Sequence, residues 1–125
     1  MKVLICGDRE WDDREKIRGE LRALRKTWDV LEICEGECRG ADTIAREEAE
    51  RMGIPVRPFP ADWRRYGKRA GPIRNRQMLK EFAPDMVLAF HDDIERSRGT
   101  RDMVTIARAA NIPTHVFRAT RSRVA

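Results

Sequence analysis

The chain has 125 residues, of which 41% are hydrophobic and 38% charged, and its formal net charge is +5. This length suits one domain with its own core. No apolar run approaches the roughly 20 residues that a membrane span requires, and the short apolar start lacks the cleavage site of a secretory signal peptide, so we expect a cytoplasmic protein.

Predicted strands and helices alternate along the chain. In chain order we expect a strand over 2–6, a helix over 12–26, a strand over 30–34, a helix over 41–52, a strand over 55–59, a helix over 73–82, a strand over 86–90, a helix over 100–110 and a strand over 113–117. Apolar residues recur at helical spacing in the longer segments and fill the short ones. Gly53 and Asn111, each followed by Ile-Pro, are expected to end helices in the left-handed conformation.

This alternation predicts an α/β fold, a Rossmann-like three-layer α/β/α sandwich whose central parallel sheet has about five strands. The apolar strand over 86–90 suits the centre of the sheet. We place the domain at 1–117 and a basic C-terminal tail at 118–125. The amphipathic helix over 12–26 could pair two copies, so a homodimer is a hypothesis.

The three cysteines, Cys6, Cys34 and Cys38, are an odd number without a secretion signal. This argues against a disulfide framework and favours buried free thiols. No matching His or second Cys pair follows Cys34 and Cys38, so we expect no metal site, and nothing in the chain implies a cofactor.

Three stretches place a glycine at a helix start with an arginine close by: 36–42, 71–75 and 97–100. A helix start presents unpaired N–H groups with partial positive charge, glycine permits close approach, and arginine matches phosphate oxygens. All three helices are expected to follow strands and so to begin at the carboxyl edge of the sheet, where ligands of such folds bind. The pattern predicts one pocket for a phosphorylated ligand.

The segment 60–71 shows no strong periodicity, and aromatic residues alternate with cations in it. It is long for a strand-to-helix connection. Two interpretations stay open. Trp63 or Tyr66 could stack on a base in a loop that covers the ligand, or Trp63 could anchor an ordinary surface loop.

The chain resembles the SLOG superfamily, in the YspA-type branch related to YpsA, with kinship to LOG phosphoribohydrolases and to DprA/Smf. The resemblance rests on the order and spacing of Gly7-Asp8-Arg9 with Trp11, the stretch 35–42, Phe59-Pro60-Ala61-Asp62-Trp63, the stretch 70–78, the stretch 84–90 and the stretch 97–103. It implies a Rossmann-like sheet with a nucleotide-derived ligand at its edge.

The resemblance also bears on catalysis. Arg74 to Met78 is similar to the Arg-Lys-x-x-Met motif of the hydrolase branch, and Arg98 to Asp102 is similar to the end of its Pro-Gly-Gly-x-Gly-Thr-x-Glu-Glu motif. The Pro-Gly-Gly part is absent, and Asp102 and Met103 stand where the paired glutamates would be. If the protein is an enzyme, Asp102 would stabilise an oxocarbenium-like state and Arg74 would contact phosphate. Asp102 could instead bind ribose or cap its helix.

We therefore expect binding of a nucleotide or nucleotide-derived ligand, by a sensor or sequestering protein. The alternatives are a phosphoribohydrolase that cleaves the N-glycosidic bond of a nucleoside monophosphate and, less favoured, a protein that binds single-stranded nucleic acid. His91 could face the ligand, and Asp42 could instead satisfy its own helix start. The predicted ligand-binding residues are Gly7, Asp8, Arg9, Gly36, Arg39, Gly40, Asp42, Trp63, Gly71, Arg74, Asn75, Arg98, Gly99 and Thr100.

Overall fold

The computed structural model describes residues 1–29 and 31–120. Its strands form one all-parallel sheet in the order β3-β2-β1-β4-β5. The strands are β1 (Lys2–Gly7), β2 (Glu32–Glu35), β3 (Val56–Pro58), β4 (Met86–Phe90) and β5 (Thr114–Phe117). The helices are α1 (Arg14–Thr27), α2 (Ala41–Arg51), α3 (Trp63–Tyr66), α4 (Ala70–Gln77) and α5 (Arg98–Ala109), with short helical turns η1 (Gly67–Arg69), η2 (Met78–Phe82) and η3 (Ile94–Arg96).

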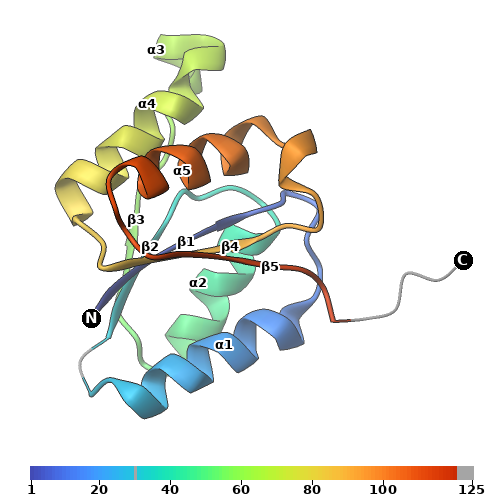
Figure 1. Ribbon diagram of the computed structural model, residues 1–125, viewed down its shortest axis with the longest axis vertical. Coiled ribbons are helices and arrows are strands. Elements are labelled where there is room, and N and C mark those ends of the chain that lie inside the picture. Colours follow the sequence, from blue (N-terminus) through green and yellow to red (C-terminus); the bar gives the residue numbers. More distant parts are fainter. Residues whose placement is uncertain (30, 121–125) are drawn as a thin grey trace, which may run out of the picture.

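The sheet lies between two helical layers. Helices α1 and α2 cover one face, and α4 and α5 cover the other (Figure 1). Each face has its own apolar cluster, one around Ile17, Leu21 and Ile33 and the other around Met78 and Met103. The predicted Rossmann-like α/β fold with a five-stranded parallel sheet is confirmed.

The strand order reverses between β1 and β4. Connections from β1 step outward through β2 to β3, after which the chain crosses back and places β4 on the other side of β1. The central strand is therefore β1, and the expectation that 86–90 forms the centre was wrong by one position. Strand β4 is nevertheless an inner strand, because it lies between β1 and β5. Four of its five residues are buried, as its apolar sequence predicts.

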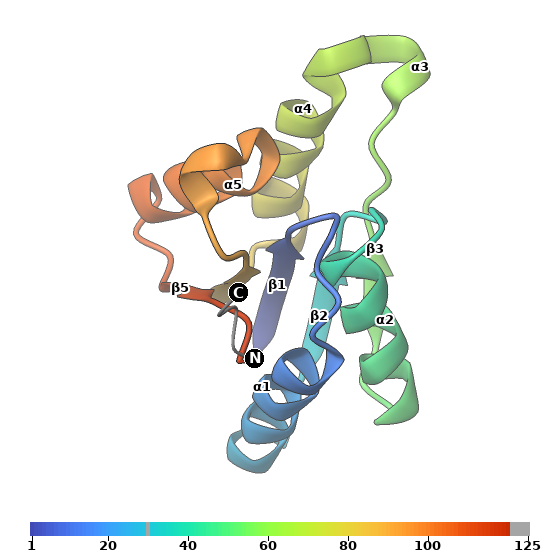
Figure 2. The same ribbon diagram turned by 90° about the vertical axis from the view of Figure 1, so that its right-hand side faces the viewer.

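The segment 60–71 is more regular than the sequence suggested. It forms α3 and η1 and runs into α4, which begins at Ala70 rather than at residue 73. Asp62 caps α3 by accepting a hydrogen bond from the Arg65 N–H at 3.1 Å. Pro72 lies in the first turn of α4, where its missing N–H leaves no hydrogen bond unmade. Together α3 and η1 form an arm that extends beyond the N-terminal end of α4 (Figure 2).

Two helices end as predicted, with a residue in the left-handed conformation. Gly53 after α2 has φ +69°, and Asn111 after α5 has φ +60°. Both residues adopt the left-handed conformation, and the Ile-Pro that follows starts the extended chain. This prediction is confirmed.

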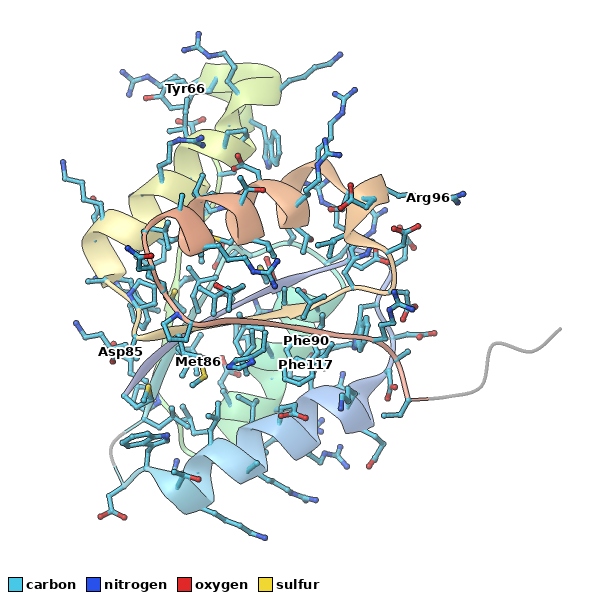
Figure 3. The ribbon with its side chains drawn as sticks, viewed as in Figure 1. Tyr66, Asp85, Met86, Phe90, Arg96 and Phe117 are labelled. Atoms are coloured by element: carbon cyan, nitrogen blue, oxygen red, sulfur yellow. The ribbon has the colours of Figure 1, made fainter. Side chains whose placement is uncertain are left out.

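Aromatic rings fix the carboxyl ends of β4 and β5 against the helical layer of α1. Phe90 and Phe117 (Figure 3) stack with ring centroids 5.2 Å apart. Trp11 meets Phe90 edge-on, with ring centroids 5.6 Å apart. The apolar side of α1 is used here, since Ile17 and Leu21 are fully buried in the same cluster. A homodimer through α1 stays a prediction.

The chain remains attached to the domain after β5. The Ala119 N–H donates to Asp92 at 2.9 Å, and the Thr120 N–H and hydroxyl donate to Asp13 at 2.7 and 2.9 Å. The first residues of the predicted tail therefore pack on the domain, while 121–125, with Arg121 and Arg123, lie outside the described residues. No helix in the described ranges is long and apolar enough to cross a membrane.

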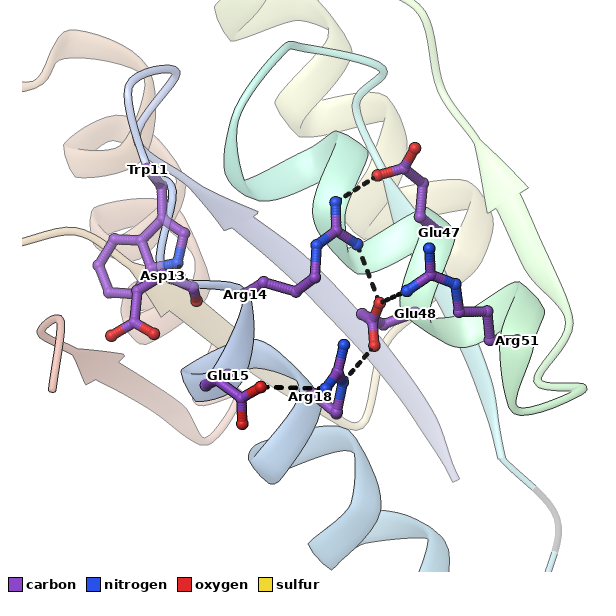
Figure 4. Close-up of polar contacts among 8 residues, drawn as sticks. All are labelled: Trp11, Asp13, Arg14, Glu15, Arg18, Glu47, Glu48 and Arg51. Atoms are coloured by element: carbon purple, nitrogen blue, oxygen red, sulfur yellow. Dashed lines mark hydrogen bonds and ion pairs between the residues drawn. The ribbon is translucent and has the colours of Figure 1, made fainter.

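A buried carboxylate joins α1 to α2. Glu48 is 2% exposed and accepts hydrogen bonds from Arg18 Nε at 2.6 Å, Arg51 Nη1 at 2.8 Å and Arg14 Nη1 at 2.9 Å (Figure 4). The Arg18 hydrogen bond is the main cause that lowers the pKa of Glu48 to about 2. The ion-paired form is therefore the stable one over a wide pH range.

Replacing Glu48 by glutamine is expected to destabilise the protein by about 2 kcal/mol at pH 7. A neutral amide forms no ion pair with the three arginines, which then lie close together without a compensating negative charge. The pKa of Glu48 is lower in the folded than in the unfolded state, so its contribution is complete above about pH 4.5 and is lost as pH falls toward 2. Urea denaturation from pH 3 to 7 measures both effects. Glu47→Gln is the control, since Glu47 is 42% exposed and bonds only Arg14 among the described residues. Equal losses in the two variants would contradict the prediction.

Candidate ligand-binding site

A cavity of about 730 Å³ opens at the carboxyl edge of the sheet. It lies where the strand order reverses between β1 and β4, and loops from both halves of the fold line it. The residues are Cys6, Gly7, Asp8, Arg9, Glu10, Cys38, Arg39, Asp42, Trp63, Lys68, Gly71, Pro72, Arg74, Asn75, His91, Arg96, Ser97, Arg98, Gly99 and Thr100. This is the place where ligands bind in open parallel sheets.

Most of the predicted ligand-binding residues line this cavity. Gly36, Gly40 and the predicted catalytic Asp102 do not. Sequence reasoning missed Cys6, Glu10, Cys38, Lys68, Pro72, Arg96 and Ser97. Most of these residues adjoin predicted ones in the chain, so proximity in sequence alone was the signal that could have found them.

Gly40 has a structural reason to be glycine. It precedes α2 with φ +77°, and a Cβ there would overlap the carbonyl oxygens of Asp8 and Arg9. The next residue, Ala41, donates its N–H to the Asp8 carbonyl at 3.1 Å. Gly40 thus lets the loop after β1 pack directly on the start of α2.

Gly36 gives room to a buried arginine. A Cβ there would overlap the Arg74 guanidinium, whose Nη1 donates to the Gly36 carbonyl at 2.6 Å and to the Phe59 carbonyl at 3.4 Å. Arg74 is 8% exposed, and its Nη2 lies 3.9 Å from Cys38 Sγ. Arg74 therefore links α4 to the loops after β2 and β3. A contact between Arg74 and phosphate stays a prediction.

Asn75 joins α4 to the start of α5. Its Nδ2 donates to the Gly99 carbonyl at 3.2 Å and to Asp102 Oδ2 at 3.0 Å, while its Oδ1 accepts from Arg74 Nε at 3.1 Å. Asp102 also accepts from Arg76 Nη1 at 3.5 Å. These contacts hold the Asp102 carboxylate against α4 and outside the cavity lining.

The start of α5 faces the cavity with little around it. Ser97 caps the helix by accepting from the Thr100 N–H at 3.1 Å. Apart from the adjoining backbone of α5 and the two chain neighbours of Gly99, no atom of the described residues lies within 4 Å of the position that a Cβ on Gly99 would occupy. Exposed Arg96 and Arg98 flank this turn. Free N–H groups, open space and two guanidinium groups make a site suited to an anion.

Two buried carboxyl groups lie behind the loop after β2. Asp42 Oδ2 accepts from the N–H groups of Gly36 and Cys38, both at 3.2 Å, and Glu35 Oε1 accepts from the Glu37 N–H at 2.7 Å. Asp42 thus orders the loop before its own helix. Asp42 Oδ1 and Glu35 Oε2 are buried without a hydrogen bond among the described residues. Burial raises the pKa of Asp42 to about 6 and that of Glu35 to about 7.

Trp63, the first residue of α3, lines the cavity. It is 46% exposed, and the guanidinium of Arg9 lies 5.3 Å from its ring centroid. This pair joins the arm to the loop after β1. Burial raises the pKa of the Cys6 thiol well above its usual range, so that this cavity residue stays protonated. No group of three or more His, Cys, Asp and Glu side chains in the described ranges is arranged to hold a metal ion.

Sequence comparison gives the family. Residues 1–66 match the model of the YspA, cpYpsA-related SLOG family. The chain belongs to this family. It is also 40% identical over 122 residues to the Gene 61 protein of Mycobacterium phage D29, covering 93% of this chain and 95% of that protein. The resemblance stated from the motifs is confirmed.

A solved structure shares the fold of this family member. The UDP-GlcNAc 2-epimerase of Neisseria meningitidis, solved with UDP-GlcNAc bound, superposes with a TM-score of 0.58 at 17% identity. The match covers 94% of this chain and 32% of the epimerase chain, so it concerns one part of that enzyme.

Proposed function

We propose that the cavity binds a nucleotide or nucleotide-derived molecule, as part of a sensing or sequestering role. The observation that carries the proposal is the open start of α5, where Gly99 has open space at the position of a Cβ and lines the cavity together with Arg96 and Arg98. Membership of the SLOG family supports it, and the fold neighbour's bound nucleotide sugar agrees with it.

The phosphate of the ligand is assigned to the first turn of α5. Backbone N–H groups there have no helical partners, and the two arginines add fixed positive charge. The base is assigned to another part of the cavity lining, where the Trp63 ring and the Arg9 guanidinium offer flat surfaces for stacking. The cavity volume lies within the range typical of small-molecule sites.

Hydrolysis of the N-glycosidic bond is the weaker candidate. Its chemistry needs a carboxylate beside the ribose, and the Asp102 carboxylate contacts Asn75 and Arg76 instead of lining the cavity. Incubation with nucleoside monophosphates, followed by chromatography of released base, tests this candidate directly.

The binding proposal is tested with Gly99→Asp. The substitution places a carboxylate in open space at the start of α5, where it suits the helix dipole but repels phosphate. We expect affinity for the best-bound of AMP, GMP, CMP and UMP, measured by calorimetry, to fall at least tenfold while the melting temperature stays the same or rises. Gly99→Asn, of equal size and no charge, is the matched control and should change affinity less than threefold.

Two results would overturn this proposal. One is that none of the four nucleotides binds the wild-type protein. The other is that Gly99→Asp binds as tightly as Gly99→Asn. Tighter binding of single-stranded oligonucleotides than of mononucleotides, with a steep loss of affinity between about 50 and 200 mM salt, would instead favour the nucleic-acid alternative.

A further inference from the structure

Asp8 and His91 stand at the ends of the two strands between which the strand order reverses. Asp8 follows β1, His91 follows β4, and both line the cavity. The Asp8 N–H donates to the Phe90 carbonyl at 2.9 Å, and the His91 N–H donates to the Phe117 carbonyl at 2.9 Å. The sheet therefore holds the backbone of both residues, which fixes the positions of the Cα atoms from which their side chains start.

The hydrogen bonds of His91 define its tautomer. The Asp93 N–H donates to His91 Nδ1 at 2.9 Å, so Nδ1 carries a lone pair and the proton of the neutral ring is on Nε2. The imidazole is thereby presented as a donor at Nε2. Its side chain is 11% exposed.

Asp8 presents an acceptor beside this donor. Its Oδ1 accepts from the Glu10 N–H at 2.9 Å, and its Oδ2 lies 3.8 Å from His91 Nε2. That distance is too long for a hydrogen bond, but one oxygen atom can lie within bonding distance of both. Within the described ranges neither Asp8 Oδ2 nor His91 Nε2 takes part in a hydrogen bond.

A hydroxyl group matches this pair. Its proton can go to Asp8 Oδ2 while its oxygen accepts from His91 Nε2. A phosphate does not match, since its oxygens would be repelled by the Asp8 carboxylate, and its place is the turn of α5 that follows His91 in the same loop. On the basis of the proposed function, we infer that Asp8 and His91 bind a ribose hydroxyl and select ribonucleotides over their deoxy forms.

The probes are ribose 5-phosphate and its 2-deoxy and 3-deoxy forms, measured by calorimetry against inorganic phosphate. These sugars need no choice of base. Wild-type protein is expected to bind ribose 5-phosphate at least tenfold more tightly than one of the deoxy forms, because a hydrogen bond to a charged acceptor is lost. Inorganic phosphate should bind with the affinity of the sugar that lacks the selected hydroxyl, or more weakly.

Asp8→Asn tests the assignment, since it removes the charge and keeps an acceptor for the Glu10 N–H. We expect the preference for ribose to fall to less than threefold, while affinity for inorganic phosphate stays the same or rises as a negative charge leaves the cavity. His91→Phe should also reduce the preference. Glu95→Gln, exposed in the same loop and outside the cavity lining, is the matched control and should leave all affinities unchanged.

The outcomes separate the two proposals. If all three sugar phosphates bind equally, or if Asp8→Asn keeps the wild-type preference, this inference is wrong while phosphate binding at α5 stands. A water held between Asp8 and His91 without a role in recognition would give that result. If no sugar phosphate, nucleotide or inorganic phosphate binds, the proposed function itself fails.

Discussion

Glu35→Gln is expected to stabilise the protein by about 2 kcal/mol at pH 8 and to change its stability little at pH 5. Glu35 is fully buried at the end of β2, and its Oε2 has no hydrogen bond among the described residues. Burial raises its pKa from 4.5 to about 7, so at pH 8 folding must bury a charge. A glutamine keeps the shape and the acceptor for the Glu37 N–H without that charge.

The sign of the pH dependence follows from the direction of the shift. A carboxyl group whose pKa is higher in the folded than in the unfolded state favours folding at low pH, and this advantage is lost as pH rises through the folded pKa. Glu35 acts in this way between about pH 4.5 and 7, and Asp42 between about pH 4 and 6. Glu48 acts in the opposite direction below about pH 4.5. Taking the three groups together, wild-type stability is therefore expected to be greatest at about pH 4, because above that pH Glu35 and Asp42 lose stability faster than Glu48 gains it.

Urea denaturation of wild type and Glu35→Gln at pH 5, 6, 7 and 8 measures the prediction. The difference between the two proteins should grow with pH and level off above pH 7. Glu37→Gln is the matched control, because Glu37 is exposed two residues later in the same loop. A difference that is independent of pH would mean that Glu35 is ionised throughout, and the argument from burial would be wrong.

The strands and most helices could be predicted because each carries its own local signal. Apolar runs gave the positions of all strands to within two residues, and Gly53 and Asn111 gave two helix ends. Helix α3 was missed, since its four aromatic and basic residues, none of them buried, have no apolar period to detect. Its cap, Asp62, was visible in the sequence but is equally common in turns.

The candidate site was predicted at the level of loops but not of contacts. Parallel strands bring their carboxyl ends to one edge, so the loops that line the cavity followed from topology. Whether an individual residue faces the ligand or its neighbours depends on pairings distant in sequence. Asn75 with Asp102 is such a pairing, 27 residues apart, and it turns a predicted catalytic carboxylate toward α4.

The glycines show most clearly that contacts between distant residues could not be predicted from the sequence. Gly40 and Gly99 follow arginines in similar sequences, yet one is enclosed by backbone and the other faces open space. The sequence alone does not distinguish a glycine that leaves room for a ligand from one that leaves room for a neighbouring carbonyl group. Gly40 was therefore predicted to bind ligand when its clearest role is to let the loop after β1 contact α2.

Gly40→Ala is accordingly expected to destabilise the protein by about 3 kcal/mol or more. A side chain disfavours φ +77°, and the new Cβ would overlap the carbonyl oxygens of Asp8 and Arg9. The loop would have to move away from α2, taking Asp8 and Arg9 with it, so affinity for nucleotide should fall with stability. Thermal and urea denaturation measure the first effect, and calorimetry with the best-bound nucleotide measures the second.

The matched control for Gly40 is Gly53→Ala. Gly53 has φ +69°, but beyond its two chain neighbours no atom of the described residues lies within 4 Å of the position of a Cβ, so alanine there adds backbone strain without a collision. We expect a loss of about 1 kcal/mol and unchanged nucleotide affinity. The difference between the two variants isolates the contact between the loop after β1 and the start of α2. Equal losses would show that this contact is not what requires glycine at position 40, and the cavity wall formed by Asp8 and Arg9 would need another explanation.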